Sequence, residues 1–474
     1  MDQQFDSNGF LVGRLGTKWT RWVAGLGTLA ALSSGAGGGQ AVALEAEQIL
    51  SYNLGKFLIQ PQLDASAQFT GNLFYGADNP QPGGLVTIDR TLDGVTVPVE
   101  ILSAPGRPVE SDLLWYVSPG MEIQYGKNPE NSLSLGYFHD FIFYDNNSDF
   151  NSGQDRVLFN ARLELGRFTV VGTDSIQWLD TILSGNTQTV QRVPIRRLAW
   201  NDNYRVNYDF SMKTDFYTVF NHDLIDYLQA VNLYDQGTLR GTIGTTYKPS
   251  ERIGIFVEGQ GGHTDIASNL AIQAPGEDSW VYGGFVGARG TFTPRITGSI
   301  KVGYETREFS GLDSEGDGGG PAVGMALTYT PTQRLLLNLA YDRRVGVSPQ
   351  FSAQSYTYSL LSLTANQQIG SRGRWSVLGR LGLNFGTYSD VASSGVGLVN
   401  GVTPVRFATD TGRDDQTYSA SVGVVYQPRP WLTSSLTYSF EKYQTEFNDQ
   451  YTALTTGLND YVANRVILQV AIGY

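Results

Sequence analysis

Three histidines are the side chains best suited to acid–base or metal chemistry in this chain: His139, His222 and His263. Their spacing matches no metal-ligand motif, so the sequence predicts neither a metal site nor any other cofactor. A histidine paired with an aspartate and a nucleophile can also serve a hydrolase. No nucleophile motif accompanies these three, so no catalytic residue is predicted and a hydrolase is only the third hypothesis.

Two short acidic segments are candidate calcium ligands, since carboxylate-rich loops bind hard cations. Residues 311–320 read GLDSEGDGGG, and residues 410–415 contain three aspartates. Neither segment has the ligand spacing of an EF-hand. We therefore interpret both as solvated surface loops that carry part of the negative charge of the chain.

The elements that would position these side chains are strands with a period of two. In the C-terminal segment 464–474, NRVILQVAIGY, apolar residues recur at every second position from Val466 onward. Alternate side chains of a strand point to opposite faces, so one face suits lipid and the other suits a wetter interior. A tilted strand needs about 9 to 11 residues to cross a bilayer. The segment is therefore predicted to be a membrane-crossing strand.

The composition favours one large β-barrel over soluble domains. Aromatic residues make up 12% of the chain, glycine occurs 56 times and charged residues make up only 16%, against about 25% in soluble domains. The mean hydropathy of -0.20 fits a barrel, because lipid-facing residues are averaged with lumen and loop residues. The absence of cysteine excludes disulfides, and the net charge of -12 argues against a nucleic-acid partner.

A repeated aromatic-x-Pro motif marks one rim of the predicted barrel. It begins at Tyr247, Phe292, Tyr329 and Tyr426, each time at the end of an alternating strand. Proline cannot sit inside a ladder, and an aromatic side chain suits the membrane interface. Further turns of this rim are predicted at residues 126–129, 166–167 and 369–374. The strands between these turns number about 18, with 16 as the alternative, since bacterial barrels have even strand numbers.

The long connections are predicted to fall together at the extracellular end, with both termini on the periplasmic side. These loops are residues 71–112, 145–155, 173–198, 223–237, 262–279, 310–320 and 391–415. Residues 174–197 fit no period well, and residues 215–229 fit a strand running into a short loop helix. The predicted fold class is all-β, a single transmembrane antiparallel barrel with short periplasmic turns and long extracellular loops.

Charged residues on the inward faces of the strands are the candidate functional residues. Pore-lining charges tune selectivity, whereas charges on the lipid face cost about 2 to 4 kcal/mol at mid-membrane. The predicted inward basic residues are Arg162, Arg205, Arg289, Lys301, Arg344, Arg380 and Arg465. The predicted inward acidic residues are Glu122, Glu164, Asp209, Glu258, Glu305, Asp342 and Glu441. Because the two signs nearly match, mutually paired wall residues are the alternative to a selective conduit.

The N-terminal region predicts an export signal. Basic residues precede an apolar core at residues 22–32, and Ala41-Val42-Ala43 has the small-x-small form that signal peptidases cleave. An unstructured, alanine-containing N-terminus is the alternative. The predicted organisation is a signal peptide at residues 1–43, a short periplasmic lead-in at residues 44–53 and the barrel at residues 54–474.

From the aromatic-x-Pro turns, the segment YDNNSD at residues 144–149 and the final AIGY, the chain resembles outer-membrane β-barrel porins encoded beside exopolysaccharide synthesis genes. The resemblance covers residues 54–474 and implies an outer-membrane protein of a Gram-negative cell that helps to export or anchor a secreted polysaccharide. It implies no catalytic residues. It also implies that Val470, Ile472 and Tyr474 form a C-terminal signal for the barrel-assembly machinery, with Tyr474 where phenylalanine is usual.

Three functional hypotheses follow from these observations. The first is a passive conduit for a hydrophilic solute or for polysaccharide export. The second is a structural or adhesion barrel with a plugged lumen whose loops bind surface polysaccharide, and the third is a hydrolase at the barrel rim. The expected partners are outer-membrane lipid and lipopolysaccharide, the barrel-assembly machinery and a secreted polysaccharide.

Overall fold

A computed structural model describes most of the chain from residue 50 onward. The described residues are 4–5, 11–12, 50–77, 83–92, 95–103, 109–128, 131–187, 193–231, 233–268, 276–310, 317–351, 354–370, 373–390, 392–399, 403–456, 458 and 460–473. Within the predicted signal peptide they comprise only β1 (Gln4–Phe5) and β2 (Leu11–Val12), which pair with each other. The rest of that segment and Tyr474 lie outside the described residues.

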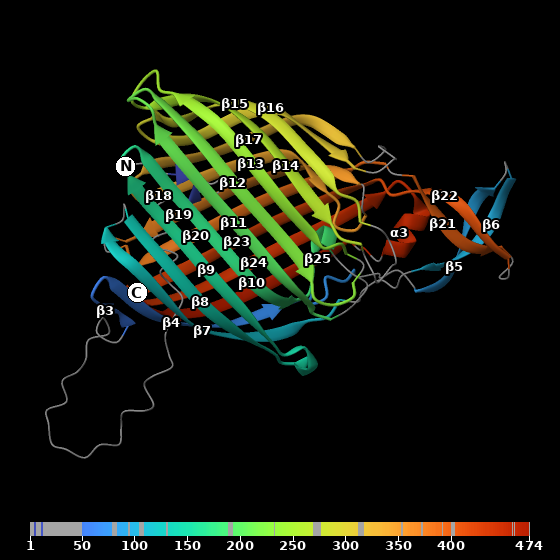
Figure 1. Ribbon diagram of the computed structural model, residues 1–474. Coiled ribbons are helices and arrows are strands. Elements are labelled where there is room, and N and C mark those ends of the chain that lie inside the picture. The colour runs from blue at the N-terminus through green and yellow to red at the C-terminus, as the bar shows by residue number, and fades with distance from the viewer. Residues whose placement is uncertain are drawn as a thin grey trace, which may run out of the picture.

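A closed antiparallel barrel of 18 strands forms the body of the described chain and confirms the predicted fold class (Figure 1). The last strand pairs with the first from Arg465↔Thr70 to Ile472↔Leu63, and this seam closes the sheet. The short β3 (Tyr52–Leu54) adds to the start of the first strand. In order around the wall the strands are β4 (Phe57–Thr70), β7 (Asp112–Asn128), β8 (Asn131–Tyr144), β9 (Ser152–Leu165), β10 (Phe168–Thr181), β11 (Ile195–Asp209), β12 (Thr214–Tyr227), β13 (Gln236–Tyr247), β14 (Ile253–Ile266), β15 (Ser279–Thr293), β16 (Ile296–Phe309), β17 (Gly318–Thr332), β18 (Leu335–Val347), β19 (Ser355–Ile369), β20 (Trp375–Tyr388), β23 (Arg413–Arg429), β24 (Leu432–Phe447) and β25 (Tyr461–Ile472).

Alternation along each strand separates an apolar outer face from a polar inner face. In the ladder between β24 and β25, Leu436 lies opposite Leu468, and each side chain is 53% exposed. One position along, Ser435 lies opposite Gln469 on the other face. Because the period is two, a whole strand places its apolar residues on one side of the wall. The predicted period thus holds to the end of the sheet.

Short connections gather at one end of the barrel, called here the turn end, and long ones at the other, called the loop end. At the turn end β15 stops at Thr293 and β16 starts at Ile296. The ladders shift register beside the aromatic-x-Pro motifs in three of these hairpins, between Thr291/Thr293, Tyr329/Thr332 and Tyr426/Arg429. Proline has no N–H to donate, so the strand bulges there and reverses a little beyond the predicted turn.

Two of the predicted loops contain strands of their own, which the prediction did not include. β5 (Gly84–Leu92) and β6 (Val95–Ser103) lie between β4 and β7, and β21 (Ala392–Val399) and β22 (Thr403–Asp410) lie between β20 and β23. The four strands form one sheet in the order β22-β21-β6-β5, which projects beyond the loop end and is called here the loop sheet (Figure 1). Its buried core is Ile88, Val99 and Ile101.

A short helix covers one face of the loop sheet. This helix, α3 (Gln450–Thr456), joins β24 to β25, and its Leu454 packs on the core of the loop sheet. Two 3₁₀ turns, η1 (Ser148–Phe150) and η2 (Gly185–Thr187), lie in other loop-end connections. None of the described helices is long and apolar enough to span a membrane.

An ion pair ties the loop sheet to the segment that carries α3. The Arg90 guanidinium donates to both carboxylate oxygens of Asp449 at 2.7 and 2.5 Å, and the two side chains are 15% and 13% exposed. Replacing Arg90 with alanine should weaken this attachment by about 1.5–3 kcal/mol, because it removes charged hydrogen bonds from a partly buried carboxylate. We expect proteinase K to cut the loop sheet of the R90A variant faster while the barrel stays intact.

The neighbouring Asp89 provides the control for this prediction, since it is exposed on the opposite face of β5. The D89A variant should be cut at the rate of the unchanged protein. Equal cleavage of the R90A and D89A variants would show that the ion pair does not hold the loop sheet.

Strand boundaries differ from the prediction where polar residues interrupt the outer apolar row. β10 extends to Thr181 and β11 starts at Ile195, so the loop predicted at 173–198 is too long. Asp174 and Asp202 are partners on the outer face and hide the period of two there. The helix predicted within 215–229 is wrong, because β12 continues to Tyr227. The loops predicted at 223–237 and 262–279 are likewise shorter, and the loop-end connection at 448–460 was missed.

Candidate functional site

All of the charged residues predicted to face inward alternate along their strands with the exposed apolar residues. Their side chains therefore point to the inner face of the sheet. Lys301 lies between Ile300 and Val302, which are 39% and 49% exposed on the outer face. Arg380 precedes the exposed Leu381, and Arg465 precedes the exposed Val466 in the same way. The inner face of the barrel, here called the lumen wall, therefore carries these charges and is the candidate functional site.

Several of these charges form ion pairs with each other or with a near neighbour, as the alternative interpretation predicts. The pairs are Arg162 with Glu164 at 2.6 Å, Lys301 with Glu258 at 2.6 Å, Arg344 with Asp342 at 3.0 Å, Arg289 with Asp215 at 3.2 Å and Arg465 with Glu441 at 3.6 Å. Pairing therefore describes part of the lumen wall but not all of it.

Aromatic rings hold three cations of the lumen wall in fixed positions. The guanidinium groups of Arg205 and Arg289 lie 4.1 and 4.7 Å from the ring centre of Tyr217. The ammonium of Lys301 lies 4.7 Å from the ring centre of Phe285. A cation over a ring face is attracted to it without losing its charge. Arg205 in addition donates to Asn207 at 2.9 Å and forms no ion pair with a described carboxylate.

The inward cations that were not among the predicted residues include Arg240 and Arg307. Arg307 is only 3% exposed, and one of its amino groups donates to Thr264 at 3.0 Å and to Ser279 at 2.7 Å. Neither arginine forms an ion pair with a described carboxylate within 4.0 Å. The period of two could have identified both, because Arg307 follows Glu305 by two positions and Arg240 lies between Thr238 and Thr242.

The opposite side of the lumen wall is acidic. Among their described inward positions, β4, β7 and β8 carry Asp64, Asp112, Glu122 and Asp140 and no basic residue. Asp140 pairs with Arg156 of the neighbouring β9 at 2.9 Å. In a closed ring of 18 strands, β4, β7 and β8 lie across the lumen from β15, β16 and β17. The lumen wall therefore has an acidic side facing a side rich in cations.

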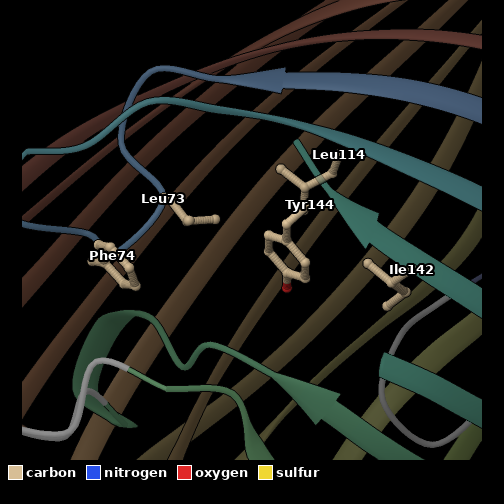
Figure 2. Close-up of a cluster of buried hydrophobic side chains, with 5 residues drawn as sticks. All are labelled: Leu73, Phe74, Leu114, Ile142 and Tyr144. Carbon is tan, nitrogen blue, oxygen red and sulfur yellow. The ribbon is translucent and has the colours of Figure 1, made fainter. Parts of the chain in front are cut away.

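The chain that leaves β4 folds inward and narrows the loop end of the lumen. Figure 2 shows Leu73 and Phe74 of this segment beside Leu114, Ile142 and Tyr144 of the lumen wall. All of these side chains are at most 6% exposed. Residues 71–77 are called here the inward segment, and its apolar side chains make it part of the lumen wall.

Polar contacts fix the inward segment to the opposite edge of the seam. The amide of Asn72 donates to the carbonyl of Val462 at 2.9 Å, Arg465 donates to the Tyr75 hydroxyl at 2.6 Å, and the rings of Tyr75 and Tyr461 are 4.9 Å apart. Tyr75 has a φ of 52°, the only positive φ of a non-glycine residue in the described chain. Burial raises the pKa of the Tyr75 hydroxyl, which Arg465 partly opposes. These contacts hold a backbone conformation that costs about 1–3 kcal/mol.

The other loop-end connections also contact one another around the lumen opening. The backbone N–H of Tyr234 donates to Pro349 at 3.1 Å, which joins the connection after β12 to that after β18. The amide of Gln354 donates to Ser389 and Thr411 at 2.9 and 3.0 Å. The connections after β10 and β12 share a buried cluster of Leu183, Ile195, Val231 and Leu233. The loop end is therefore a packed assembly of loops.

The three histidines lie on the outer face, away from the lumen wall, and each lies beside an aspartate. The distances are 2.8 Å from His139 to Asp155, 3.3 Å from His222 to Asp202 and 3.6 Å from His263 to Asp278. An aromatic ring also contacts each histidine. Within the described chain, no group of three or more potential ligands could hold a metal ion.

His139 is the histidine with the most enzyme-like surroundings. It lines a cavity of about 550 Å³ that also contacts Ser152. Ser152 lies opposite Ile142 on the inward face, however, whereas His139 and Asp155 face outward. The side chain of Ser152 therefore points to the opposite face of the sheet from the histidine that would have to activate it.

The residues predicted to form a C-terminal assembly signal lie partly within the described chain. Val470 and Ile472 are on the outer face of β25, opposite Ser434 and Leu432. Tyr474 lies outside the described residues. Recognition by an assembly machinery stays a prediction.

Comparison with known proteins identifies a family over the C-terminal part of the chain. The family model described as "Putative beta-barrel porin 2" matches residues 232–473, just over half of the chain. No curated protein matches.

Solved structures with a similar barrel include the siderophore receptor PirA from Pseudomonas aeruginosa, with 10% identity over 86% of this chain and 80% of that chain and a TM-score of 0.38. The outer membrane protein OpdK from Pseudomonas aeruginosa has 10% identity over 87% of this chain and 99% of that chain, with a TM-score of 0.39. A bacterial polysaccharide outer membrane secretin has 8% identity over 87% of this chain and 98% of that chain, with a TM-score of 0.32.

Proposed function

Because the chain belongs to the family described as putative beta-barrel porin 2, we propose that it is a passive conduit for hydrophilic solutes. The protein is an outer-membrane β-barrel, and its family and fold point to a channel more than to an enzyme. The proposal extends to export of a secreted polysaccharide as the solute, with the loop end facing the outside of the cell.

The polar, charged lumen wall is the observation that carries this proposal. Strand number sets barrel diameter, and barrels of 16 to 18 strands are wide enough to enclose an aqueous channel. Charges such as Lys301 and Arg380 point to the inside while apolar side chains cover the outside. A wall that served only to fill a closed core would require no such charges, because buried ions are costly unless each is fully paired.

A structural or adhesion barrel is the second candidate, and the inward segment favours it. Leu73 and Phe74 occupy space at the loop end, and the packed loops add to this obstruction. The loop sheet also exposes Leu85 and Leu102, which are cross-strand partners with 66% and 71% of their surface accessible. In this candidate the loops bind surface polysaccharide while the lumen carries no flux.

Single-channel recording in a planar lipid bilayer separates the two candidates. The purified, folded barrel should give steady conductance steps, and an added polysaccharide that enters the lumen should block them. The same preparation heated until the barrel unfolds serves as the control and should give no steps. Silence from protein whose folded state has been verified by gel mobility would favour the adhesion barrel over the conduit.

A further inference from the structure

We propose that the inner face of β11 to β18 is a binding track for hydrophilic chains that carry carboxylates, such as acidic oligosaccharides. The track rests on the proposed conduit function and gives that conduit a preferred class of solute. Six cations of this face form the track: Arg205, Arg240, Arg289, Lys301, Arg307 and Arg344.

The six cations are distributed along the whole length of the barrel. Arg205 lies near the turn end of β11, which stops at Asp209, and Arg307 lies near the loop end of β16, which stops at Phe309. Lys301 lies on the same strand as Arg307 but closer to the turn end. A carboxylate moving along this side of the lumen would therefore meet successive cations from one opening to the other.

Four of the six inward carboxylates of these strands are already engaged by other side chains. Asp215 accepts ion pairs from both Lys248 at 3.1 Å and Arg289 at 3.2 Å. Glu305 is fully buried in the wall and accepts a hydrogen bond from Gln260. Glu258 and Asp342 pair with Lys301 and Arg344, and the remaining inward acidic residues of these strands are Asp209, at the turn end of β11, and Asp223.

Arg205 and Arg240 are half-buried and retain their capacity to bind an anion. Within the described chain, neither they nor Arg307 has a carboxylate partner within 4.0 Å. The side chain of Arg307 is 3% exposed, and its buried Nε has no hydrogen-bond partner. Arg307 therefore adds positive charge from behind the wall surface, whereas the half-buried guanidinium groups of Arg205 and Arg240 can bind a carboxylate or another oxyanion in bidentate geometry.

The acidic side of the lumen wall reinforces the track. Asp64 and Glu122 lie across the lumen from β15 to β17 and form no ion pair with a described cation. An anionic chain is repelled by that side and attracted by the track, so the two effects place it against the cations. A neutral chain of equal length experiences neither effect.

The test compares how two oligosaccharides of equal length block single channels. Galacturonate oligomers should block the unchanged protein at a concentration about fivefold lower than neutral maltose oligomers do, since one added charge interaction in water contributes about 1 kcal/mol, which is about a factor of five. Raising KCl from about 0.1 M to about 1 M shortens the screening length from about 10 to about 3 Å and should largely remove this difference.

The double variant Arg205→Gln with Arg240→Gln should lose most of the preference for the acidic oligomer and shift the reversal potential in a KCl gradient away from anion selectivity. Lys442→Gln is the matched control, because Lys442 lies on the outer face of β24, and it should behave as the unchanged protein. Heat-dependent gel mobility verifies that each variant is folded. If the double variant does not fold, the block by the two oligomers and the reversal potential are measured on the single variant Arg240→Gln.

Two results would overturn the track. Steady conductance with equal block by the acidic and neutral oligomers would reject the track and leave the conduit intact. Absence of conductance from the folded, unchanged protein would reject the conduit itself, and the track with it.

Discussion

Replacing Leu73 and Phe74 together with serine is expected to give channels of clearly higher conductance than the unchanged protein. The two side chains are buried against the lumen wall at 6% and 4% exposure. Burial of each contributes about 1.5–3 kcal/mol, so the double change should weaken docking of the inward segment by about 3–6 kcal/mol. A shift of about 5.5 kcal/mol converts a segment that is docked 99% of the time into one that is undocked 99% of the time. Planar-bilayer recording measures this effect.

The control for this experiment makes the same chemical change on the loop sheet. Leu85 and Leu102 are 66% and 71% exposed, so their replacement with serine removes little buried surface. Channels of this control variant should conduct as the unchanged protein does. If both double variants show the same conductance, the inward segment does not limit the current.

Replacing Gly298 with valine is expected to prevent the barrel from assembling. Gly298 and its cross-strand partner Gly290 have φ values of +153° and +136°, and a Cβ on Gly298 would lie 2.1 Å from the carbonyl oxygen of Ala326. The strained backbone would cost about 1–3 kcal/mol and the overlap with the neighbouring strand about 1–3 kcal/mol more. Heat-dependent gel mobility after refolding in detergent should show little or none of the folded form.

Gly284 of the same hairpin serves as the control. A Cβ built on Gly284 meets no atom within 4 Å, and the residue lies on the outer face of β15, where valine suits lipid. The G284V variant should fold in normal yield. Normal folding of the G298V variant would mean that β16 can shift enough to accept a side chain at that position.

The barrel and the side of its wall on which each charge lies could be predicted from the sequence because lipid outside and water inside impose a period of two. Lys301, for example, lies between two apolar residues and therefore faces inward. The period also placed Arg240 and Arg307 on the inner face, although neither was selected. Polar residues such as Asp174 and Asp202 lie on the outer face and interrupt the apolar period of two. The predicted ends of those strands therefore differ from the observed ends.

Loop structure could not be predicted in the same way, because contacts distant in sequence determine it. Leu73 and Phe74 are adjacent apolar residues without a period, and only their packing on Ile142 reveals that the segment folds inward. The hairpin of β5 and β6 does alternate, with Val97, Val99 and Ile101 on one face, but its core is completed by Leu454, hundreds of residues later. Such pairings require the closed barrel to bring the loops together.

The seam between β4 and β25 has a consequence for biogenesis. The ladder between these two strands forms last. Until residues 461–472 have been synthesised, the sheet therefore has two open edges whose backbone amide and carbonyl groups lack hydrogen-bond partners. Hydrocarbon cannot hydrate such groups, and in water they recruit other chains. A truncated chain that lacks these residues is therefore expected to aggregate through its open edges and not to insert as a narrower pore.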